Sequence, residues 1–201
     1  MNRNKIKIFL VILFSFPIIV IAQKRSISIN GIYNGLGSLY IITDNSEVKG
    51  YFQNYRGERN NFSTIFFFVG KRADNNNMIY EIKTFYPGDM DTIKGTCKIL
   101  NPKNLEITLD ETPPGDVFSI NHNKDNFEIV KEKNWKGIGY IISNKVRLMP
   151  NPNNLKKSIS YITKNDCVAI LKKDNIWVQV EYIGKNRNRI GWILSEQIKI
   201  L

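Results

Sequence analysis

The chain has 201 residues and a formal charge of +11 at pH 7, with only two cysteines and one histidine. Two cysteines exclude a disulfide-rich scaffold, and a single histidine excludes the usual Cys/His zinc spacings, so neither a metal site nor a cofactor is expected. Lysine and arginine are spread through the chain rather than clustered, which favours a solvated surface over a patch for nucleic acid. No nucleic-acid partner is therefore expected.

Residues 1–22 have the layout of a secretory signal peptide. The first seven positions contain three basic residues and no acidic one, and residues 8–21 form an apolar run. Cleavage after Ala22 would leave Gln23 as the new N-terminus. The run is shorter than the roughly 20 residues of a membrane span and contains Pro17. Cleavage is the favoured outcome, and an uncleaved anchor is the alternative.

Export would still leave a basic protein. Removing three of the 29 lysines and arginines leaves 26 against 18 acidic residues, so the mature chain keeps a formal charge of +8. We expect this mature chain in the periplasm or outside the cell, without a transmembrane span. Its charge is compatible with an anionic polymer of the cell envelope.

Residues 23–134 are expected to form one all-β domain. Short β-type runs alternate with turn residues from Gly31 to about Val130, and no helical period continues beyond two turns. Eight candidate strands at hairpin spacing predict an antiparallel up-and-down barrel or a tight sandwich. The candidates are residues 38–43, 48–55, 63–70, 78–86, 92–99, 105–110, 117–120 and 127–130.

The opening of this domain contains Gly31-Ile32-Tyr33, then Gly37-Ser38, then Val48-Lys49-Gly50-Tyr51. This pattern resembles the start of avidin-like and lipocalin-like barrels. The resemblance implies a ligand-holding interior and hence a small-molecule binder. The alternative is a barrel filled by its own side chains, and the candidates for that filling are Phe52, Phe66, Phe68, Tyr80 and Ile82.

Residues 135–201 contain four motifs in order. They are V-R-x-x-P from Val146 to Pro150, the hairpin Asp166-Cys167-Val168, W-x-x-V from Trp177 to Val180, and Gly191-Trp192-Ile193. In order and spacing they resemble a bacterial SH3-like domain over nearly its whole length. The resemblance implies a small β-barrel that binds peptidoglycan or a peptide.

One position departs from the family pattern. Asn165 stands where the family usually has glycine before the hairpin aspartate. Asparagine also tolerates a left-handed backbone conformation, so the turn is expected to survive.

Aromatic residues are the best candidates for a recognition surface in the C-terminal domain, because sugars and peptides stack on aromatic faces in the grooves of SH3-like barrels. Trp192 belongs to a fold motif of the family, and a structural role is favoured for it. The candidate ligand-binding residues are Tyr140, Tyr161, Trp177, Tyr182 and Trp192.

No catalytic residue is assigned. His122 stands in a polar loop and Cys97 in the middle of a strand, where a loop histidine and a core thiol are expected rather than a cysteine-peptidase pair. Cys97 and Cys167 fall in different domains, either as free buried thiols or as one interdomain disulfide. The Pro-Gly-Asp turns at 87–89 and 114–116 are explained by turn chemistry without Ca²⁺.

Together these patterns predict an exported, non-enzymatic binding protein whose SH3-like domain recognises a cell-envelope component, either peptidoglycan or a peptide. One alternative is a periplasmic interaction protein, such as an inhibitor or immunity factor, that binds an envelope protein. The other is an enzyme built on dispersed carboxylates. Such an enzyme would need a cleft in which two of the candidate carboxylates lie close together. The candidates are Glu81, Asp89, Asp91 and Asp116.

Overall fold

The computed structural model describes residues 29–44, 46–56, 62–73, 78–113, 124–152, 160–184 and 189–201. The predicted signal peptide, Asp116, His122 and the expected strand at 117–120 lie outside these ranges. Within them the chain consists of strands, connecting loops and one 3₁₀ turn, η3 (Ser195–Gln197), which confirms the predicted all-β class. The described residues contain no helix that is long and apolar enough to cross a membrane.

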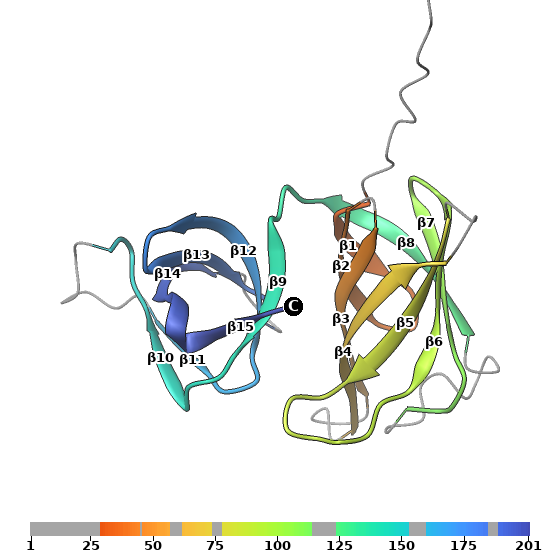
Figure 1. Ribbon diagram of the computed structural model, residues 1–201, viewed down its shortest axis with the longest axis horizontal. Helices are drawn as coiled ribbons and strands as arrows, with labels where there is room; N and C mark the ends of the chain where they lie inside the picture. Colours follow the sequence, from red (N-terminus) through yellow and green to blue (C-terminus); the bar gives the residue numbers. More distant parts are fainter. Residues whose placement is uncertain are drawn as a thin grey trace, which may run out of the picture.

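The N-terminal unit is a closed eight-stranded barrel. Each strand pairs antiparallel with the next one along the chain, and β1 pairs with β8 to close the barrel, as Figure 1 shows on its right-hand side. The sandwich alternative is therefore excluded. The strands are β1 (Gly31–Asn34), β2 (Ser38–Thr43), β3 (Glu47–Arg56), β4 (Phe62–Arg72), β5 (Ile79–Phe85), β6 (Lys94–Asn101), β7 (Asn104–Leu109) and β8 (Lys124–Glu132).

Strand β1 was not among the expected strands. Its four residues include Gly31 and Asn34, both poor strand formers, so pairing with β2 and β8 rather than local propensity makes it a strand. Its ladder to β8 changes register between Ile32 and Tyr33. Gly31 is required here, because a Cβ would lie 2.5 Å from the carbonyl oxygen of Lys131.

The barrel interior is filled by its own side chains, which is the second of the two alternatives. The rings of Phe52 and Phe66 stack with centroids 5.0 Å apart, and Phe127 meets Phe52 edge-on at 6.0 Å. An eight-stranded barrel is just wide enough for such a filling. All five predicted filling residues are buried in this one cluster: Phe52, Phe66, Phe68, Tyr80 and Ile82.

One carboxylate shares the inward face of β8 with Phe127. Asp125 is buried, and its Oδ2 accepts a hydrogen bond of 2.7 Å from the backbone N–H of Leu36 in the β1–β2 turn. Asn54 of β3 donates to the Leu36 carbonyl, so both backbone groups of Leu36 are held by other strands. Burial raises the pKa of Asp125, although hydrogen bonds from the backbone of Leu36 and Asn126 act in the opposite direction.

We expect Asp125→Asn to be at least as stable as the wild type near pH 7. Because the pKa of Asp125 is raised on folding, its ionised form opposes folding above that pKa, and stability is recovered as the pH falls towards the unfolded value of about 3.9. Asparagine keeps an oxygen for the Leu36 N–H without the charge. Urea unfolding of both proteins between about pH 7 and pH 4 should show the wild type gaining stability relative to the variant on acidification. A variant that is clearly less stable near pH 7 would contradict this account.

The C-terminal unit consists of a five-stranded antiparallel sheet in the order β14-β13-β12-β9-β15 and a two-stranded sheet of β10 and β11. A bridge between Met149 and Trp192 links the two sheets, and a second apolar core lies inside this unit. The strands are β9 (Gly137–Ile141), β10 (Lys145–Leu148), β11 (Ser160–Thr163), β12 (Cys167–Asp174), β13 (Trp177–Tyr182), β14 (Arg189–Leu194) and β15 (Ile198–Ile200).

Two local expectations can be checked against this unit and the connection that leads to it. Asn165 has a φ of 70°, so asparagine does supply the left-handed conformation of the turn before β12. β8 ends at Glu132 and β9 begins at Gly137, so the predicted division between residues 134 and 135 falls within the connection.

Cys97 lies inside the barrel and Cys167 lies between the units. Both are free, buried thiols, which is the first of the two alternatives.

Candidate functional site

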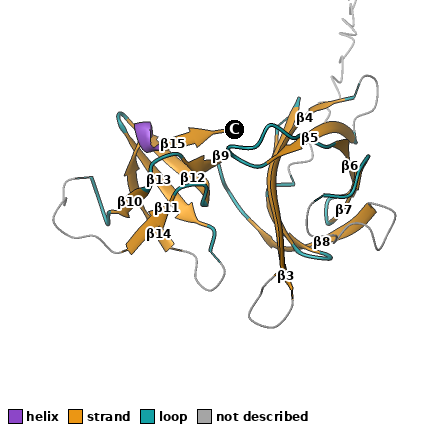
Figure 2. Cartoon of the chain, turned by 90° about the horizontal axis from the view of Figure 1, so that it is seen from below, coloured by secondary structure: helices purple, strands orange, loops and turns teal. Residues whose placement is uncertain are grey.

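The two units pack against each other through the outer faces of their sheets. Strand β9 contacts β2 and β3, and Figures 1 and 2 both show β9 on the side that faces the barrel. The Phe67 ring of β4 lies at the centre, with its centroid 4.8 Å from that of Tyr51 and 5.4 Å from that of Tyr140. The buried residues of this interface are Tyr40, Tyr51, Phe67, Trp135, Ile138, Cys167, Ala169 and Ile183.

A buried carboxylate ties the connection between the units to β13. Oε2 of Glu181 accepts a hydrogen bond of 2.8 Å from the indole N–H of Trp135, and Oε1 lies 2.5 Å from the ammonium of Lys133. Trp135 is itself buried, with its ring 6.3 Å from that of Tyr40 on the barrel. The connection is therefore packed as part of the interface, and we expect the two units to move as one body.

Two of the five candidate aromatic residues are used in packing. Tyr140 is half-buried in the interface, with its ring centroid 6.3 Å from that of Phe85. Tyr182 is half-buried against the core of the C-terminal unit, and burial, with Asp166 nearby, raises its pKa. Packing against neighbouring residues therefore accounts for the positions of both side chains, and no ligand is needed to explain them.

Two further candidates lie on different sheets. Trp192 is only 9% exposed, and its backbone exchanges two hydrogen bonds with Met149. Tyr161 of β11 is 49% exposed, and the ammonium of Lys145 lies 4.2 Å from the centre of its ring. The five predicted residues are thus not gathered into one aromatic platform.

Trp177, the fifth candidate, shares the outer side of β13 and β14 with Trp192. Trp177 lies opposite Leu194 in the ladder, and Trp192 lies opposite Gln179, so all four point to the same side. Ile190, opposite Glu181, extends this surface and is 52% exposed. We call it the β13–β14 face, defined by Trp177, Gln179, Ile190, Trp192 and Leu194.

The β13–β14 face lies beyond the contact between the units. The interface cluster includes Ile138, Tyr140 and Ala169 of β9 and β12, and none of the residues that define this face. Strand β14 ends the sheet, and both views place it farther from the barrel than β9. Trp177 is partly exposed there. Among the described residues, the barrel therefore leaves one aromatic and aliphatic surface of the C-terminal unit uncovered.

The carboxylates considered for catalysis lie on different elements. Asp89 and Asp91 are exposed in the loop between β5 and β6, whereas Glu81 projects from β5 on the barrel wall. Within the ranges that the structure describes, no group of three or more His, Cys, Asp or Glu side chains is placed to hold a metal ion. Gly88, with a φ of 103°, takes the positive value expected of its Pro-Gly-Asp turn.

The two thiols are poor nucleophiles where they lie. Burial raises the pKa of Cys97 to about 12, and burial together with the neighbouring Asp166 raises the pKa of Cys167. The thiolate is the reactive form of cysteine. Both side chains therefore stay protonated near neutral pH and act as small apolar residues.

A groove of about 770 Å³ lies on the outer wall of the barrel and has Leu201, the end of the chain, among its lining residues. The strand register aligns one row of its side chains across β3, β4, β5 and β6: Lys49, Val69, Lys83 and Lys94. The next row contains Glu47, Lys71, Glu81 and Thr96. Figure 2 shows the marked end of the chain next to this wall.

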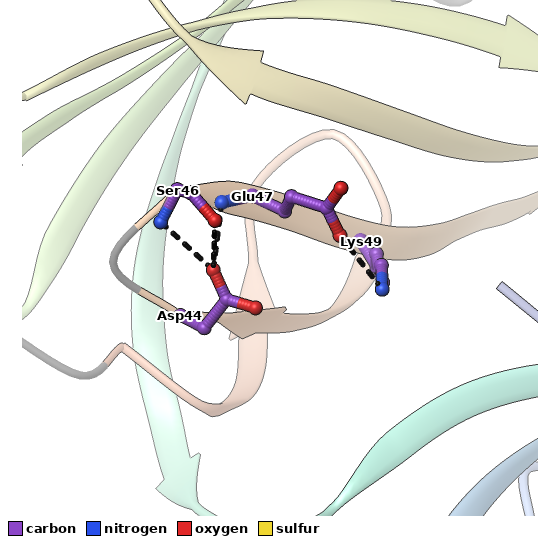
Figure 3. Close-up of polar contacts among 4 residues, drawn as sticks. All are labelled: Asp44, Ser46, Glu47 and Lys49. Carbon is purple, nitrogen blue, oxygen red and sulfur yellow. Dashed lines mark hydrogen bonds and ion pairs between the residues drawn. The ribbon is translucent and has the colours of Figure 1, made fainter.

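Figure 3 shows how the β2–β3 turn fixes one side of this groove. Asp44 Oδ1 accepts hydrogen bonds from the backbone N–H groups of Ser46 and Glu47 and from the Ser46 hydroxyl, and these bonds lower the pKa of Asp44. Glu47 then forms an ion pair of 2.9 Å with Lys49. The charge of Lys49 is therefore already matched by a carboxylate.

No protein-family model matches the chain, and neither a curated protein nor a solved structure matches it. The β13–β14 face and the groove are the two open surfaces that could carry its function.

The sequence prediction missed the interface and the lysine row, and only the interface has a signal in the sequence. The apolar runs at 39–42, 65–68 and 167–171 contain no alternation, which is typical of strands buried on both faces, and they form much of the interface. The lysine row has no linear signal, because its members are brought together only by the register of four strands.

Proposed function

We propose that the chain is an exported, non-enzymatic binding protein whose C-terminal unit is an SH3-like domain that recognises peptidoglycan or a peptide of the cell envelope. The resemblance in sequence supports the domain assignment, and each of its four motifs lies on or next to a strand of this unit. Export is supported by the pattern of residues 1–22.

The β13–β14 face is the observation that carries this proposal. Because the barrel interior is filled, a binding site is expected on an outer surface. On this face an indole ring, Trp177, precedes the polar side chain of Gln179 on the same side of β13, and the exposed Ile190 lies at the other end of the face. Such a surface offers a sugar or peptide both a stacking partner and a hydrogen-bonding group.

Trp177→Ala is expected to weaken binding at least tenfold while costing about 1 kcal/mol or less in stability. The ring is partly exposed, so its removal opens little core, whereas an anchoring aromatic contributes strongly to binding. Sedimentation of the purified mature protein with isolated sacculi measures binding, and urea unfolding measures stability. Leu100→Ala is the matched control, because Leu100 is exposed on β6 of the barrel, and it should bind like the wild type.

The same experiment separates the alternatives. Unchanged binding of Trp177→Ala to sacculi would overturn the assignment of the face. The inhibitor or immunity-type function would instead be supported if the wild-type protein does not bind sacculi but captures a partner in stoichiometric amount from periplasmic extract. In that case the Trp177 and Leu100 variants show whether the partner uses the β13–β14 face.

A further inference from the structure

Two lysines in the barrel groove face each other, and no described residue forms an ion pair with either of them. Lys83 of β5 and Lys94 of β6 are direct partners in the antiparallel ladder, and both side chains are exposed on the outer wall. Directly opposite residues have Cβ atoms about 5 Å apart, and like charges at that separation destabilise a sheet. Neither ammonium has an ion-pair partner in the described part of the chain.

Lys83 and Lys94 form the most electropositive part of the groove, because two of its other lysines each have a carboxylate beside them. Glu47 is engaged by Lys49, and Lys71 lies opposite Glu81 in the ladder between β4 and β5. Asp110, which follows β7 and whose backbone N–H donates to the Lys94 carbonyl, also lines the groove, as does Leu201. The Asp110 carboxylate forms no ion pair with a groove lysine among the residues described. The positive charge is thus concentrated where β5 and β6 meet.

We propose that this groove binds a phosphomonoester, with the phosphate between Lys83 and Lys94 and the rest of the ligand against Val69 and Leu201. A phosphomonoester carries a charge of about −1.5 to −2 and three acceptor oxygens, so one group neutralises both ammoniums. A carboxylate would neutralise only one. Val69 and Leu201 are both partly exposed in the groove and provide apolar surface for the body of the ligand.

The shape of the groove favours a small ligand over a peptide. Its volume of about 770 Å³ lies within the range of small-molecule sites, about 300 to 1,000 Å³. Every wall strand from β3 to β6 is paired on both sides, so a peptide finds no free strand edge to extend. The two lysines lie on the barrel, apart from the β13–β14 face, and the proposal does not depend on the proposed function.

Titration with phenyl phosphate, glucose 6-phosphate and inorganic phosphate tests the proposal, using calorimetry at constant ionic strength set with NaCl. We expect the wild type to bind a phosphomonoester more tightly than inorganic phosphate. Lys83→Met and Lys94→Met should each weaken binding at least tenfold. Lys98→Met is the matched control, because Lys98 is exposed on the same side of β6 but does not line the groove. It should bind within about twofold of the wild type.

A second readout distinguishes a binding role from a structural one. Without ligand, Lys83→Met should melt at a higher temperature than the wild type, because it removes the like-charge pair, and phosphomonoester should no longer raise that temperature. Tighter binding of phenyl phosphate would indicate an apolar, lipid-like source, and tighter binding of glucose 6-phosphate a sugar phosphate. Absence of binding, equal binding of inorganic phosphate, or an equal loss in Lys98→Met would overturn the proposal. Trp177→Ala should leave phosphate binding unchanged.

Discussion

Glu181→Ala is expected to lower the free energy of unfolding by about 3 kcal/mol or more. The substitution removes the shared partner of the Lys133 ammonium and the Trp135 indole N–H, both at the interface between the units. Breaking a buried ion pair from one side costs about 3 to 5 kcal/mol, because the other charge is left without compensation. The Lys133 side chain is 15% exposed and can reach water. The expected loss in unfolding free energy is therefore near the lower end of that range.

Glu106→Ala is the matched control for this variant. Glu106 forms an ion pair of 2.7 Å with Lys124, whose side chain is 48% exposed on the barrel surface. A surface pair of this kind contributes about 1 kcal/mol or less. Urea unfolding should be followed by tryptophan fluorescence, since all three tryptophans lie in residues 135–201, and by circular dichroism for the barrel strands. Equal losses in the two variants would show that Glu181 does not hold the units together.

The N-terminal barrel was largely predictable because several of its strands alternate between apolar and polar residues. Alternation in 92–99 and 105–110 identified strands whose inward residues, such as Cys97 and Ile107, are indeed buried. Closure was not predictable in the same way. It depends on β1, whose glycine and asparagine carry no strand signal, and on its pairing with β8 at the far end of the domain.

The candidate sites were less predictable than the fold. Aromatic residue type alone could not separate Tyr140, which is covered by Phe67 of the barrel, from Trp177, which is not. The register places both residues on the same side of the C-terminal sheet, so the difference depends on which strands of that side the barrel covers, and that is a tertiary property. The pairing of Lys83 with Lys94 likewise depends on the register of β5 and β6 and on no linear motif.

Trp192→Ala is expected to cost about 3 to 5 kcal/mol, the usual range for removing a buried tryptophan. The ring is 9% exposed, and the Lys172 ammonium lies 5.9 Å from its centre. The backbone of the same residue forms the bridge to Met149 that joins the two sheets of the C-terminal unit. Loss of the ring would therefore leave a cavity beside the link between the sheets.

Trp192→Phe makes this expectation testable even if the alanine variant fails to fold. Phenylalanine keeps most of the apolar volume, so the loss should fall well below that of alanine. Urea unfolding of Trp192→Phe, Trp192→Ala and Trp177→Ala gives the comparison, with tryptophan fluorescence from the residues that remain. A packing role predicts the largest loss for Trp192→Ala and a loss of about 1 kcal/mol or less for Trp177→Ala. Equal and large losses at both tryptophans would place Trp177 in the core and remove the β13–β14 face as a binding surface.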